Sequence, residues 1–92
     1  MPKSFTLVQL RYFTVVARTE NMRAAPLELN VTQSTLSAAI HQLEREVGVE
    51  LFHRRSSRRL RLTAEGRRLM AGARTLLEDA DQRYQSVRTE HD

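Results

Sequence analysis

Small hydrogen-bonding side chains gather in residues 31–49 of the sequence. On a helix, one face of this stretch carries groups that are small or polar but uncharged: Gln33, Ser34, Ser37, Ala38, His41 and Gln42. Such groups suit a DNA major groove, where base edges present hydrogen-bond donors and acceptors to an entering helix. An amphipathic helix packed on a protein core explains the same stretch equally well, so both interpretations stand at this point.

A run of arginines follows and could bind a polyanion. Residues 53–61 hold five arginines and no acid; they are Arg54, Arg55, Arg58, Arg59 and Arg61. The charge of the chain is also uneven, because residues 1–62 hold ten Lys or Arg against five acids, whereas residues 63–92 hold five against six. Clustered positive charge attracts nucleic acid, although short basic runs also occur on inert surfaces.

The other chemistry-bearing residues favour neither an enzyme nor a metal site. The chain has no cysteine, and His41, His53 and His91 are isolated from one another and from carboxylates at ligand spacing. It has no glycine-rich phosphate loop and no paired carboxylates in an apolar setting. We therefore expect no catalysis, no metal and no cofactor. No apolar run reaches about 18 residues, and Gln9 and Arg11 come too early for a secretory signal. We expect a cytoplasmic protein without a membrane segment.

The stretch with the polar face has clear helix signals. Thr32 can cap the first turn, and Val31 with Leu36 can form a hydrophobic staple around it. Apolar residues then recur every three or four positions, at Leu36, Ile40, Leu43 and Val47. Gly48 can adopt the left-handed conformation that ends a helix, and Val49 is placed to pack back on the last turn.

Two shorter helices are expected before this stretch. Thr6 and Gln9 form a capping box, and the apolar pattern after them predicts a helix over about residues 7–19. Asn21 is the next candidate N-cap. Pro26 would then be the fifth helical residue, where proline removes a backbone donor and crowds the preceding turn. We expect this second helix to be distorted at Pro26 or to begin later than Asn21.

A small hairpin is expected after the third helix. Apolar and polar residues alternate in part around residues 49–52 and 60–62, on both sides of Ser56 and Ser57. This pattern predicts a β-hairpin with strands of about three residues and a basic tip. Two helices, a short connection and a third helix form a helix-turn-helix, and the hairpin is its wing. The predicted fold is mainly α, a winged helix-turn-helix with a small β-hairpin wing and a long C-terminal helix.

That last helix is predicted to begin after the capping residue Thr63 and to run from Ala64 to about Thr89. Its apolar positions step by four and three residues, broken once at Arg83. A stripe of this length exceeds what so small a domain can cover, so we expect the same helix of a second copy to pair with it. A helix folded back on its own domain is the alternative. The expected dimer interface comprises Leu69, Ala73, Leu76, Leu77, Ala80, Tyr84 and Val87. We divide the chain into a winged helix-turn-helix domain, residues 1–62, and a linker helix for dimerisation, residues 63–92.

The order of several motifs resembles the N-terminal DNA-binding domain of LysR-type bacterial transcription regulators. The motifs are L-x-x-L-x-Y-F from Leu7, V-T-Q-S-T-L-S from Val31, I-x-x-L-E from Ile40, G-V-x-L-F-x-R from Gly48 and L-T-x-x-G from Leu62. The resemblance covers about residues 6–90 and implies a homodimer that binds double-stranded DNA. A larger effector-binding domain normally follows, so a small-molecule effector would bind outside this chain.

The resemblance implies three kinds of DNA contact. Base edges are read at the start of the recognition helix, by Gln33, Ser34 and Thr35. Phosphate oxygens are bound through the hydroxyls of Thr32 and Ser37. The wing contributes basic groups that reach a phosphate or the minor groove, namely Arg54, Arg58 and Arg59.

Three positions depart from the family pattern. Many members carry Ser-Arg-Gln where this chain has Ser37, Ala38 and Ala39, so a long base-reading arginine is missing and Ala38 can at most touch a thymine methyl. The wing is one residue longer than the common pattern, and Pro26 replaces a packed alanine. We therefore expect Arg55, with the other wing arginines, to supply much of the affinity for an inverted-repeat operator. The alternative is a helical interaction module whose basic hairpin binds RNA or an acidic protein.

Overall fold

Reciprocal hydrogen bonds start the first helix, α1 (Leu7–Thr19). The structure is a computed structural model that describes residues 5–53 and 59–91. The Thr6 hydroxyl accepts from the Gln9 amide at 3.0 Å, and the Gln9 side chain accepts from the Thr6 amide at 2.9 Å. The helix ends at Glu20, whose backbone is left-handed. The predicted capping box and bounds are confirmed.

The second helix, α2 (Ala24–Leu29), begins later than Asn21. The Asn21 side chain accepts from the amides of Arg23 and Ala24 at 2.7 and 3.2 Å, so it stabilises the turn that leads into the helix. Pro26 is therefore the third helical residue and not the fifth. An amide in the first turn has no partner within the helix, so proline removes no helical hydrogen bond there. The later start is confirmed, and Pro26 is buried.

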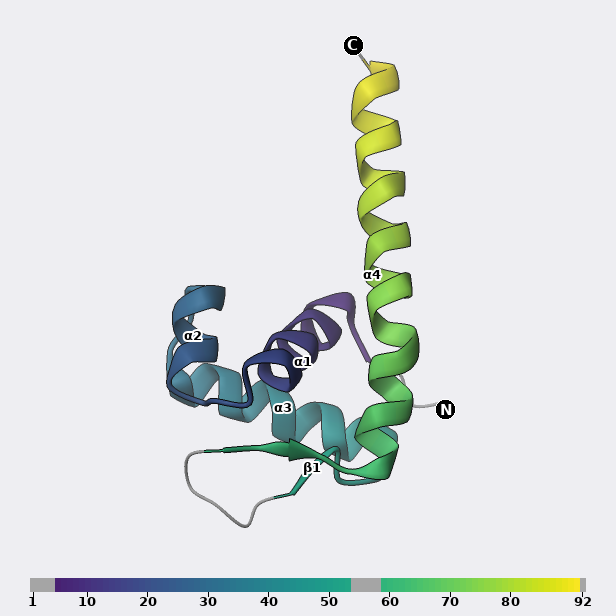
Figure 1. Cartoon of the computed structure of the whole chain (residues 1–92). Coiled ribbons are helices and arrows are strands. Elements are labelled where there is room, and N and C mark those ends of the chain that lie inside the picture. Colours follow the sequence, from purple (N-terminus) through teal and green to yellow (C-terminus); the bar gives the residue numbers. More distant parts are fainter. Residues whose placement is uncertain (1–4, 54–58, 92) are drawn as a thin grey trace.

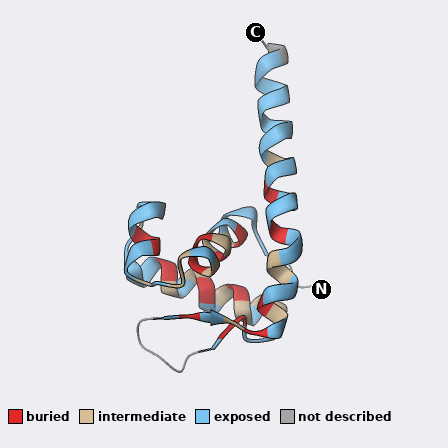
Figure 2. Cartoon of the chain, in the orientation of Figure 1, coloured by how far each residue is buried: buried red, intermediate tan, exposed pale blue. Residues whose placement is uncertain are grey.

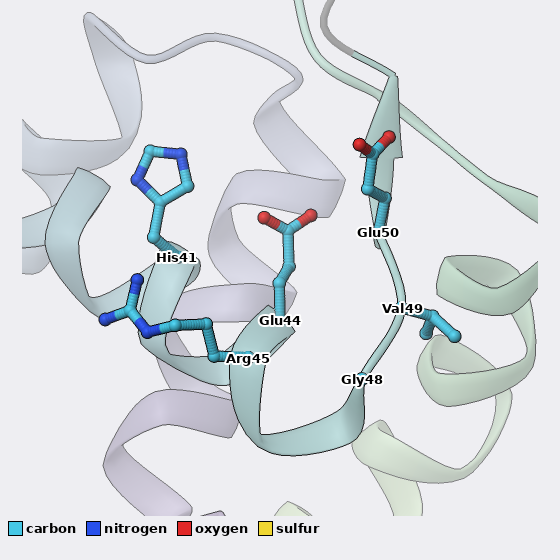
Figure 3. Close-up of a pocket in the computed structure, with 6 residues that line it drawn as sticks. All are labelled: His41, Glu44, Arg45, Gly48, Val49 and Glu50. Atoms are coloured by element: carbon cyan, nitrogen blue, oxygen red, sulfur yellow. The ribbon is translucent and has the colours of Figure 1, made fainter.

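The third helix, α3 (Gln33–Val47), has the predicted ends. The Thr32 hydroxyl accepts from the Thr35 amide at 3.1 Å, and Gly48 ends the helix with a φ of 79°. The expectation that Val49 packs on the last turn is wrong. Its side chain is 40% exposed and points away from α3 (Figure 3).

A short antiparallel hairpin follows, formed by β1 (Phe52–His53) and β2 (Arg61–Leu62). Phe52 pairs with Leu62, and His53 pairs with Arg61. The hairpin is confirmed, with strands of two residues and not three. Its connecting residues 54–58, which include three of the predicted DNA-binding arginines, lie outside the described residues.

Helix α1 lies at the centre of the fold and packs against α2, α3 and α4 (Ala64–His91). Figure 2 shows the buried positions on the inward faces of these elements. The largest fully buried side chains are Phe13, Phe52, Leu10, Leu36, Ile40, Leu43, Leu51 and Val16. The rings of Phe13 and Phe52 lie 5.5 Å apart at 50°, a tilted arrangement that aromatic pairs favour. The core therefore joins the three-helix body to the wing and turns the polar face of α3 outward.

Thr63 connects the wing to α4. Its hydroxyl accepts from the Gly66 amide at 2.9 Å, as a cap does, and donates to the Glu50 carbonyl at 2.8 Å. Helix α4 ends at His91, two residues beyond the predicted end, and its C-terminal half projects from the body (Figure 1). The predicted mainly α winged helix-turn-helix with a long last helix is confirmed.

Candidate nucleic-acid interface

The first turn of α3 presents its polar side chains to solvent. Gln33, Ser34 and Thr35 are exposed, as is the cap residue Thr32. The Thr32 hydroxyl donates to the Thr35 hydroxyl at 2.8 Å and lies 3.3 Å from the Ser34 hydroxyl. Because the Thr32 hydroxyl also accepts from the Thr35 amide, its capping bonds occupy it, while the Thr35 proton can be donated to an outside acceptor. This turn is an exposed set of donors and acceptors on a rigid helix.

The second half of the outer face offers less to a ligand. Ala38 and His41 are exposed, whereas Ser37 is half-buried. Beyond them, the Arg45 guanidinium donates to the Gln42 side chain at 2.7 Å, and Gln42 donates to Glu46 at 2.7 Å. These polar groups are bonded to one another along the helix. The structure thus places the predicted base-reading residues together in one turn, with short or internally bonded side chains after them.

The base of the wing lies against the turn between α1 and α2. Arg59 forms an isolated antiparallel bridge with Asn21, and the Leu60 amide donates to the Glu20 carbonyl at 3.4 Å. The side chain of Arg59 is exposed. The other predicted wing residues, Arg54, Arg55 and Arg58, lie outside the described residues. Among the four arginines predicted to bind DNA, Arg59 is therefore the one within the described residues, and it lies beside the helix-turn-helix.

Sequence reasoning missed the role of Glu44. One oxygen of its half-buried carboxylate accepts from the amides of Leu51 and Phe52, at 2.7 and 3.3 Å. Figure 3 shows Glu44 on α3 beside the segment that leads into β1, in a shallow hollow that His41, Arg45 and Glu50 also line. The sequence shows only that Glu44 follows Leu43 of the apolar stripe. That position does not reveal that its carboxylate binds the amides of residues seven and eight positions later.

The predicted dimer interface on α4 divides into two groups. Ala73 and Leu77 are 2% and 7% exposed and belong to the core of this chain, which corrects the expectation that they face a second copy. Leu69 packs against the same core, and Ala80 is half-buried. The remaining members are exposed at fractions of 45%, 59% and 69%; they are Leu76, Tyr84 and Val87. Part of the alternative, a helix folded on its own domain, is thus correct.

An exposed ion pair joins α4 to α1. The Arg11 guanidinium lies 3.1 Å from the Asp81 carboxylate. Both side chains are about half exposed or more, so solvent screens the pair and its contribution to stability is small.

The described part of the chain holds neither a metal site nor a membrane-spanning helix. Residues 5–53 and 59–91 contain no group of three or more His, Cys, Asp or Glu side chains that could hold a metal ion. Among the helices of those residues, none combines the length and apolar content that crossing a membrane requires.

Known proteins with a similar sequence are bacterial regulators. Residues 7–67 match the family model of the bacterial regulatory helix-turn-helix protein, lysR family. The chain is 47% identical over 76 residues to a probable hydrogen peroxide-inducible genes activator of Mycobacterium xenopi, covering 83% of this chain and 40% of that protein. It is 38% identical over 79 residues to the HTH-type transcriptional regulator YofA of Bacillus subtilis, covering 86% and 27%. The chain thus spans less than half of these relatives.

Solved structures share the whole arrangement. A crystal structure of a CbnR_DBD–DNA complex superimposes with a TM-score of 0.86 at 35% identity, over 96% of this chain and all of that one. Full-length OxyR from Pseudomonas aeruginosa gives a TM-score of 0.90 at 32% identity, over 97% of this chain and 30% of that one. With the family model matching most of its length, the chain belongs to the LysR family of bacterial regulatory helix-turn-helix proteins.

Proposed function

We propose that this chain is the DNA-binding portion of a LysR-type transcription regulator and binds an inverted-repeat operator as a dimer. One observation carries the proposal: the polar first turn of α3 is exposed while the opposite face, with Leu36, Ile40 and Leu43, is buried in the core. A helix held in this way can enter a major groove with its N-terminal residues first. Solved neighbours of similar fold include CbnR_DBD and BenM_DBD in complexes with DNA.

The exposed residues of α3 are suited to different contacts with DNA. Gln33 can form two hydrogen bonds with adenine, a pairing worth about 1–3 kcal/mol of discrimination. Ser34 and Thr35 can donate to or accept from base edges or phosphates, and Ala38 can touch a thymine methyl. Because no long side chain follows in the second turn, we infer that base reading is concentrated in the first.

The wing arginines supply affinity through the DNA backbone. Arg59 stands at the base of the wing, and Arg54, Arg55 and Arg58 are close to it in sequence. Each phosphate that such a group neutralises releases counterions. It adds about 0.9 to the slope with which the logarithm of the binding constant falls as the logarithm of the salt concentration rises. Part of the sequence preference would then come from the width of the minor groove.

Two copies would pair through the exposed part of α4, with Leu76, Tyr84 and Val87 in the interface. The charges of the helix favour an antiparallel pair. Residues 64–76 contain three arginines and one acid, whereas residues 77–92 contain two arginines and five acids. An antiparallel pair sets the basic half of each helix beside the acidic half of the other.

Cysteine crosslinking can test this orientation, because the chain has no cysteine of its own. Ala80 lies near the middle of the exposed stripe and Val87 lies at its end. In an antiparallel dimer, Ala80→Cys forms a disulfide between the two copies and Val87→Cys does not. Disulfide formation by both variants would instead support a parallel pair.

Footprinting of genomic fragments tests the DNA-binding proposal as a whole. We expect protection of two half-sites related by inversion, with centres one helical turn or a multiple of it apart. Competition with heparin supplies the control: specific binding to duplex DNA survives heparin concentrations that remove non-specific binding. Equal loss with heparin and with the specific duplex would support the alternative of a general polyanion-binding module.

The same proposal implies where the chain acts and how it is controlled. Binding to the bacterial chromosome requires a cytoplasmic protein. A small-molecule effector would act through the part of the longer relatives that this chain does not span.

A further inference from the structure

The wing needs support from outside its own strands. Each strand has two residues, and an isolated hairpin of such length is not stable in water. Under the proposed function, the wing must nevertheless hold its arginines at a fixed distance from the recognition helix α3. The contacts at the base of the hairpin show what provides this support.

Glu44 of α3 attaches the start of the wing to the recognition helix. Its Oε2 accepts from the Leu51 amide at 2.7 Å and from the Phe52 amide at 3.3 Å. Both residues are nearly inaccessible, at 2% and 0% exposure, so water is not available to replace the carboxylate as acceptor. Hydrogen bonds to an ionised acceptor are stronger and more directional than neutral ones. The entry of β1 is therefore fixed in position relative to α3.

The return strand has a separate attachment to the helix-turn-helix. The Leu60 amide donates to the Glu20 carbonyl, and Arg59 bridges to Asn21. The Asn21 side chain also holds the amides that lead into α2. Glu44 thus fixes the first end of the wing to α3, whereas backbone groups of the α1–α2 turn fix the second end.

We infer that Glu44 is a positioning residue for the wing: it fixes β1 against α3 and, through the pairing of His53 with Arg61, sets that arginine of β2 against a DNA phosphate while α3 occupies the major groove. This inference rests on the proposed DNA binding. It leads to an unusual expectation, because removal of an acid from a DNA-binding surface ordinarily strengthens binding. Loss of Glu44 weakens it, since the arginines lose their alignment.

Glu50 provides a matched control. It lines the same hollow as Glu44 and is exposed. Binding of the 92-residue chain to a random-sequence duplex is measured by fluorescence anisotropy over a series of KCl concentrations. The salt slope is the steepness with which the logarithm of the binding constant falls against the logarithm of the KCl concentration. For Glu44→Ala we expect this slope to fall by about 0.9 for each phosphate that the arginines no longer reach. For a fourfold change of salt, the loss of one phosphate contact then changes the ratio of the two affinities by about threefold. Glu50→Ala keeps the wild-type slope and binds at least as tightly.

Two further substitutions separate hydrogen bonding from charge. Glu44→Gln removes the charge but keeps an oxygen that can accept from both amides, so the wild-type slope is expected. Glu44→Asp keeps the charge but is too short to reach them, so the slope falls as in Glu44→Ala. If the slope falls in the Gln variant and keeps its wild-type value in the Asp variant, charge is responsible and the inference is overturned.

A loss of folding must not be mistaken for a loss of alignment. Circular dichroism gives the folded fraction of each variant, and the dissociation constants are corrected for it; the slope itself does not depend on that fraction. A wild-type slope in folded Glu44→Ala or Glu44→Asp overturns the inference and leaves the proposed function intact. Failure of the wild-type chain to bind any duplex overturns the proposed function instead.

Discussion

Two glycines in the same helix should respond in opposite ways to the same substitution. Gly66 lies in the first turn of α4, and Gly72 lies further along it. A Cβ added at Gly66 would stand 2.2 Å from the Leu51 carbonyl oxygen and 2.9 Å from a methyl carbon of Leu62. A Cβ added at Gly72 would meet nothing within 4 Å. We predict that Gly66→Ala destabilises the fold and that Gly72→Ala stabilises it.

The expected change in the free energy of unfolding follows from two opposing effects. Alanine is favoured over glycine inside a helix by about 0.8–1.0 kcal/mol, and Gly72→Ala should gain most of this. At Gly66 the same gain is opposed by overpacking, which costs about 1–3 kcal/mol and occasionally more. The Leu51 oxygen cannot easily retreat, because it accepts from the Thr63 amide at 3.0 Å. A contact this short with backbone lies at the upper end of that range, about 3 kcal/mol, so after subtraction of the alanine gain we expect Gly66→Ala to lose about 2 kcal/mol net.

Urea and thermal unfolding, followed by circular dichroism, measure both changes. For a domain of this size, each kcal/mol shifts Tm by about 4–8 °C. Wild type and variants are compared at one protein concentration, because the proposed dimer would make Tm concentration-dependent. A Gly66→Ala variant as stable as wild type would refute the close approach of α4 to the segment before β1.

Three further predictions concern DNA binding and assembly. Arg59→Ala should weaken binding to specific and random duplexes alike and reduce the salt slope by about 0.9 for each protomer; an unchanged slope in a KCl titration would exclude a phosphate contact. Gln33→Ala should relax the preference at one position of each half-site, because about 1–3 kcal/mol of discrimination is lost; recovery of the wild-type motif in a binding-site selection would exclude base reading. Val87→Glu should shift the chain toward monomer in sedimentation equilibrium, whereas Gln85→Glu, on another face of α4, should not; equal behaviour of the two would place the dimer interface elsewhere.

The ends of α1 and α3 could be predicted because local interactions determine them. The capping box of Thr6 and Gln9 joins residues three positions apart, as does the bond from the Thr35 amide to Thr32. Gly48 ends α3 through its own backbone conformation. Signals of this kind are complete within one turn of chain, so the sequence carries them without knowledge of the tertiary fold.

The start of α2 and the partner of α4 depend on more than local sequence. Asn21 forms the bonds of a cap, but it forms them with the turn before the helix, and so α2 begins at Ala24. On α4, apolar periodicity predicts the face that is covered but not the element that covers it. Ala73 and Leu77 satisfy the heptad spacing and yet pack into the core of this chain. The bond from Glu44 to the wing likewise joins segments that only the folded chain brings together.

The continuity of α4 limits which operators a dimer can accept. The helix runs for 28 residues without a break, about 42 Å at 1.5 Å per residue, and its first turn is seated against the Leu51 backbone. In the proposed dimer, two such helices paired side by side would set the separation and the relative rotation of the two recognition helices. An extra base pair between the half-sites turns one of them by about a tenth of a helical turn relative to the other. A continuous helix has no hinge with which to follow that rotation, so under the proposed function the spacing of the half-sites, as well as their sequence, should determine which DNA sites a dimer binds.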